Sequence, residues 1–282
     1  MILRLAALLL LASAMPVAAQ DAEQRTAWNK PQEPFRIVGN VHYVGTAGLS
    51  AFLITDPAGH VLIDGGLPES APLIAANIRK LGYRLEDVRY LLINHAHFDH
   101  AGGLAELKRL TGAKLVASAG DRPDLLAGRT LSRPELGGFP AVRVDSVVRD
   151  GETLRLGGIA LTALVTPGHT RGATSWLLAT GGKRVLFATS LTVAGQKLLG
   201  DPAYPRAAAD FRRSFARLRM VKADVFLNFH PEFFAMAEKR ARQLKGEAEA
   251  FVDPGELARQ LDRAELGFTT ELADQQARAK AR

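Results

Sequence analysis

The sequence contains no cysteine. This absence excludes disulfide bonds, thiolate metal ligands and a thiol nucleophile, so an exported form of the chain depends for stability on its core and on any bound metal. Hydrophobic residues make up 47% of the 282 residues and charged residues 23%. This composition is typical of a globular protein that buries a substantial core.

The chain begins with a short apolar run. Arg4 precedes an apolar stretch over residues 5–15, followed by Pro16 and the small residues 17–19. The stretch is too short for a comfortable transmembrane span, and the pattern is typical of a secretory signal. We predict a signal peptide over residues 1–19, a single domain over residues 20–282 and no stable membrane insertion after cleavage. An uncleaved anchor in the lipid is the alternative.

The formal charge of +7 is scattered along the chain. Its densest basic run covers residues 211–219, where Phe211, Phe215 and Leu218 follow helical spacing. The arginines of this run therefore occupy the solvated face of a helix, and stacking aromatics do not interleave with them. We expect no nucleic-acid partner, although a basic surface favours anionic substrates slightly.

Turn and strand signals alternate with helical ones. Hairpins are predicted over residues 35–44 and 51–66, and a buried strand over residues 89–94. Between them Ser70 can cap a helix that Gly82 ends.

The second half repeats this order. Residues 152–165 and 173–188 each form two strands around a Gly-Gly turn, and helices follow from about Ala207, Phe233 and Pro254. The order predicts two mixed sheets packed face to face with helices outside, an α/β (α+β) fold with four αββα layers.

Residues 95–100, H-A-H-F-D-H, hold three of the seven histidines of the chain. In a nearly extended loop after a strand, His95, His97 and Asp99 point to one side, and His100 turns elsewhere as a helix begins. Ligands divided between two directions suit two adjacent cations. Imidazole and carboxylate without sulfur favour Zn²⁺, and iron or manganese also fit these ligand types.

Two further histidines follow strands. His169 lies after the run of residues 160–165, and His230 after that of residues 225–227. Each alone is typical of a hydrogen-bonded loop residue, but together with the cluster they become candidate ligands. His42 and His60 lie in the first hairpins without a neighbouring candidate ligand, so we interpret them as structural.

At these residues the chain resembles the metallo-β-lactamase fold superfamily along nearly its whole mature length. The superfamily signature H-x-H-x-D-H is present intact, and its later metal histidines match His169 and His230. Asp64 matches an early aspartate that supports the site.

The resemblance implies two Zn²⁺ ions. It assigns His95, His97 and His169 to the first ion. It assigns Asp99, His100 and His230 to the second ion. A hydroxide that bridges two cations can form near neutral pH and attack the amide carbonyl of a β-lactam, while Asp99 orients it.

Ser190 narrows the resemblance. Glyoxalase II-type hydrolases, many lactonases and related nucleases have a bridging aspartate at this position, whereas Ser190 is similar to the third subclass of metallo-β-lactamases, which is exported to the periplasm. The resemblance assigns substrate contacts to Ser190, Thr192 and Gln196. Thr189 and Gln196 depart from the residues common in that subclass, which puts substrate range in doubt.

The sequence thus predicts a monomeric, periplasmic, zinc-dependent β-lactamase that opens penicillins, cephalosporins and carbapenems. Ser190 is not expected to be a nucleophile, because it lacks a general base free of metal duty and the S-x-x-K signature of serine β-lactamases is absent. Two alternatives stay open: a hydrolase of the same fold acting on another ester, lactone or amide, and a non-catalytic periplasmic zinc-binding protein.

Overall fold

The computed structural model describes residues 17–281. The first 16 residues, which hold most of the predicted signal peptide, lie outside the described part, as does residue 282. Among the described helices, none combines the length and apolar character that a membrane crossing requires.

The N-terminal half forms a seven-stranded sheet whose strands follow chain order. Its strands are β1 (Phe35–Val38), β2 (Val41–Tyr43), β3 (Phe52–Ile54), β4 (His60–Ile63), β5 (Val88–Leu92), β6 (Lys114–Ser118) and β7 (Ser146–Val148). Strands β1 to β4 pair antiparallel and β4 to β7 pair parallel. Both predicted hairpins are confirmed.

The second sheet has five strands in the order β12-β11-β10-β9-β8. They are β8 (Thr153–Leu156), β9 (Ile159–Val165), β10 (Thr174–Thr180), β11 (Lys183–Ala188) and β12 (Val225–Asn228). Because β10 is antiparallel to both β9 and β11, and β12 is parallel to β11, the strands β9, β11 and β12 run in one direction. Their carboxyl ends therefore lie at the same edge.

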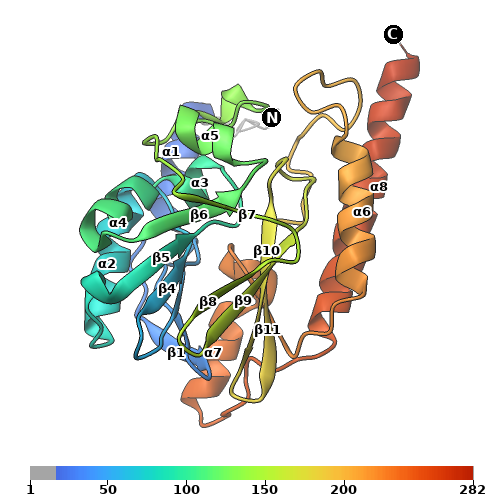
Figure 1. Ribbon diagram of the computed structural model, residues 1–282. Coiled ribbons are helices and arrows are strands. Elements are labelled where there is room, and N and C mark those ends of the chain that lie inside the picture. The colour runs from blue at the N-terminus through green and yellow to red at the C-terminus, as the bar shows by residue number, and fades with distance from the viewer. Residues whose placement is uncertain (1–16, 282) are drawn as a thin grey trace, which may run out of the picture.

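Helices cover the outer faces of the two sheets (Figure 1). On the first sheet lie α2 (Ala71–Lys80) and α4 (Leu104–Thr111), and on the second α6 (Ala207–Arg219) and α8 (Glu256–Lys280). The short helix α3 (Phe98–Ala101) lies at the edge where β5 ends. The others are α1 (Val17–Trp28), α5 (Arg122–Ala127) and α7 (Met236–Leu244). The predicted α/β class with a four-layer αββα sandwich is confirmed.

Apolar side chains between the sheets replace the disulfides that this chain cannot form. Phe52 is fully buried and packs against Tyr43, Phe187 and Phe229 at ring-centroid distances of 5.2–5.9 Å. Trp176 is also fully buried, and its indole N–H donates to the backbone oxygen of Ile93 at 3.3 Å. This bond ties the second sheet to the segment that enters the histidine cluster.

Some elements differ from the sequence prediction. Helices α1 and α5 and strand β7 were not predicted. Ser70 does not cap α2 through its side chain; its hydroxyl instead accepts from the Leu67 N–H and donates to Asn29. Gly82 ends the helix as predicted, with a positive φ of 87°.

Candidate metal centre

All six predicted ligands follow strand ends: four lie in loops, and Asp99 and His100 lie in the short helix α3. The cluster follows β5, His169 follows β9, and His230 follows β12. The shared direction of β9 and β12 brings the last two to one edge, and the face-to-face packing of the sheets sets the cluster beside them. The site therefore results from topology as much as from the local motif.

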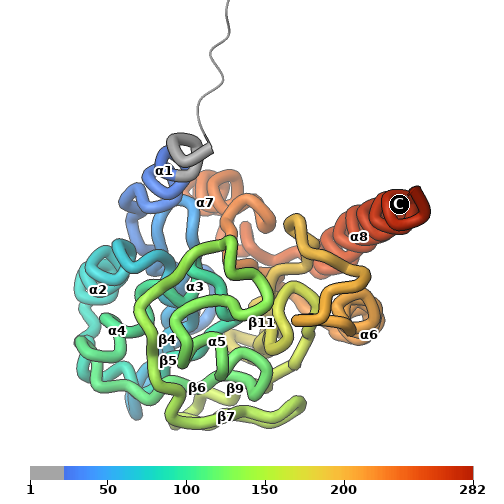
Figure 2. The backbone as a smooth tube through the Cα atoms, turned by 90° about the horizontal axis from the view of Figure 1, so that it is seen from above, coloured from blue at the N-terminus to red at the C-terminus, as the bar shows by residue number. Residues whose placement is uncertain are grey.

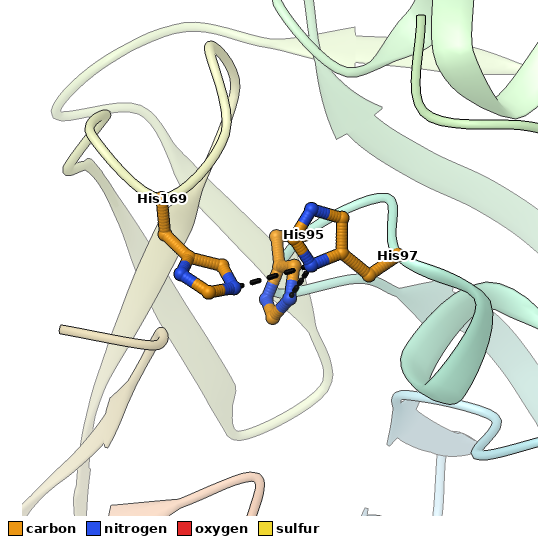
Figure 3. A group of neighbouring side chains, drawn as sticks. All are labelled: His95, His97 and His169. Carbon is orange, nitrogen blue, oxygen red and sulfur yellow. Dashed lines mark hydrogen bonds between the residues drawn. The ribbon is translucent and has the colours of Figure 1, made fainter. Parts of the chain in front are cut away.

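The first group consists of His95, His97 and His169 (Figure 3). The Nδ1 atom of His97 lies 3.1 Å from Nε2 of His95 and 3.1 Å from Nε2 of His169. All three side chains are buried. Three imidazole nitrogens from two distant loops thus face one point.

The tautomers of these rings fit a cation at that point. Nδ1 of His95 donates to Asn94 Oδ1, and Nδ1 of His169 donates to the backbone oxygen of Thr192 at 2.7 Å. Both Nε2 atoms therefore carry lone pairs, and a single His97 N–H could not satisfy both well. Nitrogens about 2.0–2.1 Å from a tetrahedral Zn²⁺ stand roughly 3.3 Å apart, close to the observed separation.

The second group consists of Asp99, His100 and His230. Asp99 Oδ2 lies 3.5 Å from Nε2 of His100 and 3.5 Å from Nε2 of His230. Nδ1 of His100 donates to Asp64 at 3.0 Å, so Nε2 of His100 is buried without a hydrogen-bond partner among the described residues. Burial lowers the pKa of His100, but Asp99 and Asp64 more than offset this, and the net pKa is raised. A cation between Nε2 and the Asp99 carboxylate can replace the proton that this pKa favours, so these residues also fit a metal.

The directions of the cluster side chains differ in part from the sequence prediction. His95 and His97 serve the first group as expected, but Asp99 lies with His100, and His95 borders both groups. Helix α3 begins at Phe98, so the alternation of an extended chain ends at His97 and does not reach Asp99.

Charges in the site suit metal binding. Burial lowers the pKa of His95 and His97 well below the usual range and that of His169 to about 4, and repulsion from other nearby histidines contributes, so these rings are neutral at pH 7. Burial raises the pKa of Asp99, but His100 and His230 more than offset this, and the net pKa lies below its ordinary value. Neutral imidazoles and an ionised carboxylate are the forms that bind metals.

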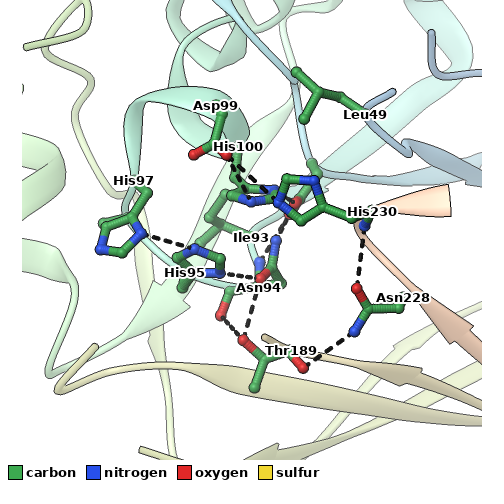
Figure 4. Close-up of polar contacts among 12 residues, drawn as sticks. Leu49, Ile93, Asn94, His95, His97, Asp99, His100, Thr189, Asn228 and His230 are labelled. Atoms are coloured by element: carbon green, nitrogen blue, oxygen red, sulfur yellow. Dashed lines mark hydrogen bonds and ion pairs between the residues drawn. The ribbon is translucent and has the colours of Figure 1, made fainter. Parts of the chain in front are cut away.

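A buried hydrogen-bond network holds these ligands from behind (Figure 4). Asn94 donates its amide to Asp64 and accepts from His95 and from the Thr189 hydroxyl, the latter at 3.1 Å. Asn228 accepts from the His230 backbone N–H at 3.1 Å and donates to the Thr189 carbonyl at 3.4 Å. Thr189, a departure noted in the sequence, thus supports the ligands. Such partners fix ring orientation and metal affinity.

Asp121 joins the two ligand loops of the first group. Its carboxylate accepts from the Ala96 N–H at 3.0 Å, the Thr170 hydroxyl at 3.1 Å and the Gly172 N–H at 2.9 Å. Burial, with repulsion from Asp124, raises its pKa to about 7. The sequence analysis did not single out Asp121, whose partners lie far from it in the chain.

The predicted substrate contacts have different positions. Ser190 and Thr192 line a cleft of about 500 Å³ above the ligands, with their hydroxyl oxygens 3.1 Å apart. Gln196 does not line it: the side chain is 1% exposed, and its amide has no hydrogen-bond partner in the described part of the chain. His42 and His60 lie away from the cleft, against Tyr83.

The cleft also has walls that the sequence analysis did not identify. Trp28, at the end of α1, lies with its ring centroid 5.5 Å from that of His230, and Phe233 lies 6.1 Å from the same ring. Arg133, in the segment between α5 and β7, lines the cleft with His97 and His169. The volume of the cleft is typical of a small-molecule site.

The family model of the metallo-β-lactamase superfamily matches residues 45–230. The chain belongs to this superfamily and is a metallo-hydrolase of this fold with a small-molecule substrate.

Curated relatives include two hydroxyacylglutathione hydrolases of Rhodopseudomonas palustris. That of strain BisB5 is 34% identical over 49% of this chain and 45% of its own length. That of strain HaA2 is 31% identical over 70% of this chain and 67% of its own length. The chain thus spans about half to two thirds of the length of these relatives.

Solved structures match over a larger share of the chain. BJP-1, a subclass B3 metallo-β-lactamase of Bradyrhizobium japonicum, is 40% identical with a TM-score of 0.85, covering 90% of this chain and 98% of that one. A Cronobacter sakazakii metallo-β-lactamase with a HARLDQ motif is 43% identical with a TM-score of 0.88, covering 90% and 99%. FEZ-1 of Legionella gormanii is 38% identical with a TM-score of 0.84, covering 88% and 98%. The predicted similarity to the third subclass is confirmed.

Proposed function

We propose that this chain is an exported, zinc-dependent β-lactamase that opens the amide ring of penicillins, cephalosporins and carbapenems. The observation that carries the proposal is the second ligand group. Asp99, His100 and His230 converge while Ser190 stands at the end of β11, where related hydrolases are expected to have a bridging aspartate. The extensive similarity to solved metallo-β-lactamases supports the same assignment.

The residues of the cleft suit this reaction. Zinc bound by the two groups supplies Lewis-acid chemistry, which lowers the pKa of water and polarises a carbonyl. Asp99 is ionised and holds the attacking water by accepting a hydrogen bond from it. The hydroxyls of Ser190 and Thr192 donate to the ring carboxylate of the substrate. Trp28 and Phe233 cover the apolar ring system and exclude bulk water.

The curated relatives favour a second candidate, hydrolysis of a hydroxyacyl thioester of glutathione. Both reactions need an activated water and a polarised carbonyl, so the fold alone does not separate them. Ser190 stands where hydrolases of the second kind are expected to have a bridging carboxylate, and this difference favours the β-lactamase reaction over thioester hydrolysis.

The test is a substrate panel on zinc-saturated protein lacking residues 1–19, with metal content measured on the same sample. We expect ring opening of benzylpenicillin, a cephalosporin and a carbapenem, abolished by a chelator and restored by zinc. His97→Ala, which removes one ligand, is the matched inactive control. Turnover of S-lactoylglutathione without any ring opening would replace our proposal with the second candidate, and no turnover of either would leave a zinc-binding protein.

A further inference from the structure

The segment between α5 and β7 passes over the top of the molecule beside the ligand loops (Figure 2). It is fixed there by Thr130, whose hydroxyl donates to the backbone oxygen of Ala96 at 2.7 Å. Ala96 lies between the ligands His95 and His97. The segment is therefore held directly against the first ligand group, and it carries Arg133 into the cleft.

The guanidinium of Arg133 is held in place, but not all of its N–H groups have acceptors in the described part of the chain. Its side chain is 11% exposed, its Nε–H donates to Glu135, and Nη1 donates to the Ala194 carbonyl at 3.2 Å. A guanidinium has five N–H donors. Nη2 donates to no residue in the described part of the chain, so donors remain at the cleft. A positioned guanidinium with free N–H groups is suited to a carboxylate.

Arg133 lies at one end of the cleft. Its partner Ala194 follows Thr192, whose carbonyl fixes His169, so Arg133 stands beside the first ligand group. The wall near His230 is formed by Trp28 and Phe233, and Arg25 and Glu232 also line the cleft. A carboxylate bound by Arg133 therefore lies on the side of the cleft that His97 and His169 line.

The connectivity of a β-lactam identifies the part of the substrate that can reach Arg133. The ring carbonyl separates the nitrogen side, which carries the ring carboxylate, from the carbon that carries the acylamino side chain. With the nitrogen toward Asp99 and His230 and the ring carboxylate at the Ser190 and Thr192 hydroxyls, the acylamino side chain extends past His97 toward Arg133. We propose that Arg133 is a specificity-determining residue that binds a carboxylate on the acylamino side chain. This proposal rests on the proposed β-lactamase function.

Carbenicillin and benzylpenicillin provide the test, because they differ by one carboxylate on that side chain. We expect Arg133→Gln to raise the KM of carbenicillin relative to that of benzylpenicillin about tenfold, the usual effect of losing a hydrogen bond between charged groups. Glu135→Gln removes the competing carboxylate and is expected to shift the same ratio in the opposite direction. High salt should weaken the preference of the wild type.

If Arg133 only joined its own segment to the loop of Ala194, its substitution would change the KM values of both penicillins by the same factor. A ratio within twofold of the wild type in both variants therefore overturns the proposal. Arg133→Lys keeps the charge but not the forked N–H groups, so its ratio of KM values should lie between those of the wild type and Arg133→Gln. If thermal melting shows that Arg133→Gln does not fold, Arg133→Lys takes its place in the test.

Binding separates this proposal from the proposed function. Calorimetric titration of the zinc-loaded protein with the ring-opened product of each penicillin, with and without Arg133→Gln, measures the carboxylate preference without turnover. If the wild type opens neither ring, the β-lactamase assignment fails, and the titration still decides whether Arg133 binds the side-chain carboxylate. Equal affinity for both ring-opened products in the presence and absence of Arg133 rejects the subsite.

Discussion

Asp64 offers a clean way to test how the second metal position is held. Its fully buried carboxylate accepts from the Asn94 N–H at 2.8 Å, from the Asn94 side-chain amide and from His100 Nδ1 at 3.0 Å. Its φ of 68° lies in the left-handed region, which asparagine tolerates about as well as aspartate. Asp64→Asn therefore changes the chemistry of the side chain and keeps its backbone preference.

The size of the effect follows from the number of acceptors. Three donors meet two carboxylate oxygens, whereas an asparagine has one oxygen and an NH₂ group that must face a donor. In Asp64→Asn, either an N–H group of Asn94 or Nδ1 of His100 therefore loses its hydrogen-bond acceptor. Loss of such an outer partner reduces metal affinity about 10- to 100-fold, or about 1.4–2.8 kcal/mol. We expect this loss at the second position, because His100 belongs to the second group.

Competition with a chromophoric chelator measures both zinc dissociation constants. In Asp64→Asn the weaker constant should rise and the tighter one should stay within a few fold. Asp56→Asn is the matched control, since Asp56 accepts backbone N–H groups at the opposite end of β4. Two unchanged constants, or loss of the first zinc in place of the second, would refute the proposed coupling of Asp64 to His100.

Further predictions follow from the same geometry. His230→Ala should cut turnover sharply and leave about one zinc per folded chain, measured by metal analysis and circular dichroism; full activity with one zinc would contradict the assignment. Asp99→Asn should lower kcat with little change in melting temperature, and an unchanged kcat would remove Asp99 from catalysis. In metal-free protein, the unfolded chain binds more protons at His169 than the folded one between its ordinary pKa of 6.5 and its buried value of about 4. The contribution of neutral His169 to the free energy of unfolding is complete above pH 6.5 and is lost as the pH falls toward 4. Between these pH values the free energy of unfolding of the wild type, measured in urea, should fall by about 3 kcal/mol more than that of His169→Gln. Parallel plots of this free energy against pH for the two proteins would exclude the effect. N-terminal sequencing of periplasmic protein should begin at Gln20, and protein retaining residue 1 would contradict export with cleavage.

The sequence predicts the ligands well because their signal is local. Each follows an apolar run that forms a strand, and the direction of β9 and β12 then places His169 and His230 at one edge. The directions expected from an extended loop were wrong for Asp99, although the resemblance assigns Asp99 and His100 to the same ion. Asp99 joins His100 because α3 begins at Phe98, so the extended chain ends before Asp99.

Residues that act through distant partners carried no such signal. Arg133 lies 36 residues from His97 in the chain, and the bonds from Thr130 to Ala96 and from Arg133 to Ala194 bring it to the site. Trp28 lies at the end of α1, a helix that the sequence did not predict. Asn94 and Asn228 could have been suspected, since each is a polar residue directly after a run of buried apolar ones.

Ser190 and the orientation of His100 belong to one arrangement. Asp64 holds Nδ1 of His100, which turns Nε2 toward Asp99 and supplies the third protein group of the second position. The position is thus complete without a carboxylate at residue 190. With two zinc ions bound as proposed, Asp99 would be the only carboxylate ligand among the described residues, so net positive charge would remain on the site. That charge would favour anionic substrates and a lower pKa for water, and the ring carboxylate of the proposed β-lactam substrate would benefit from it.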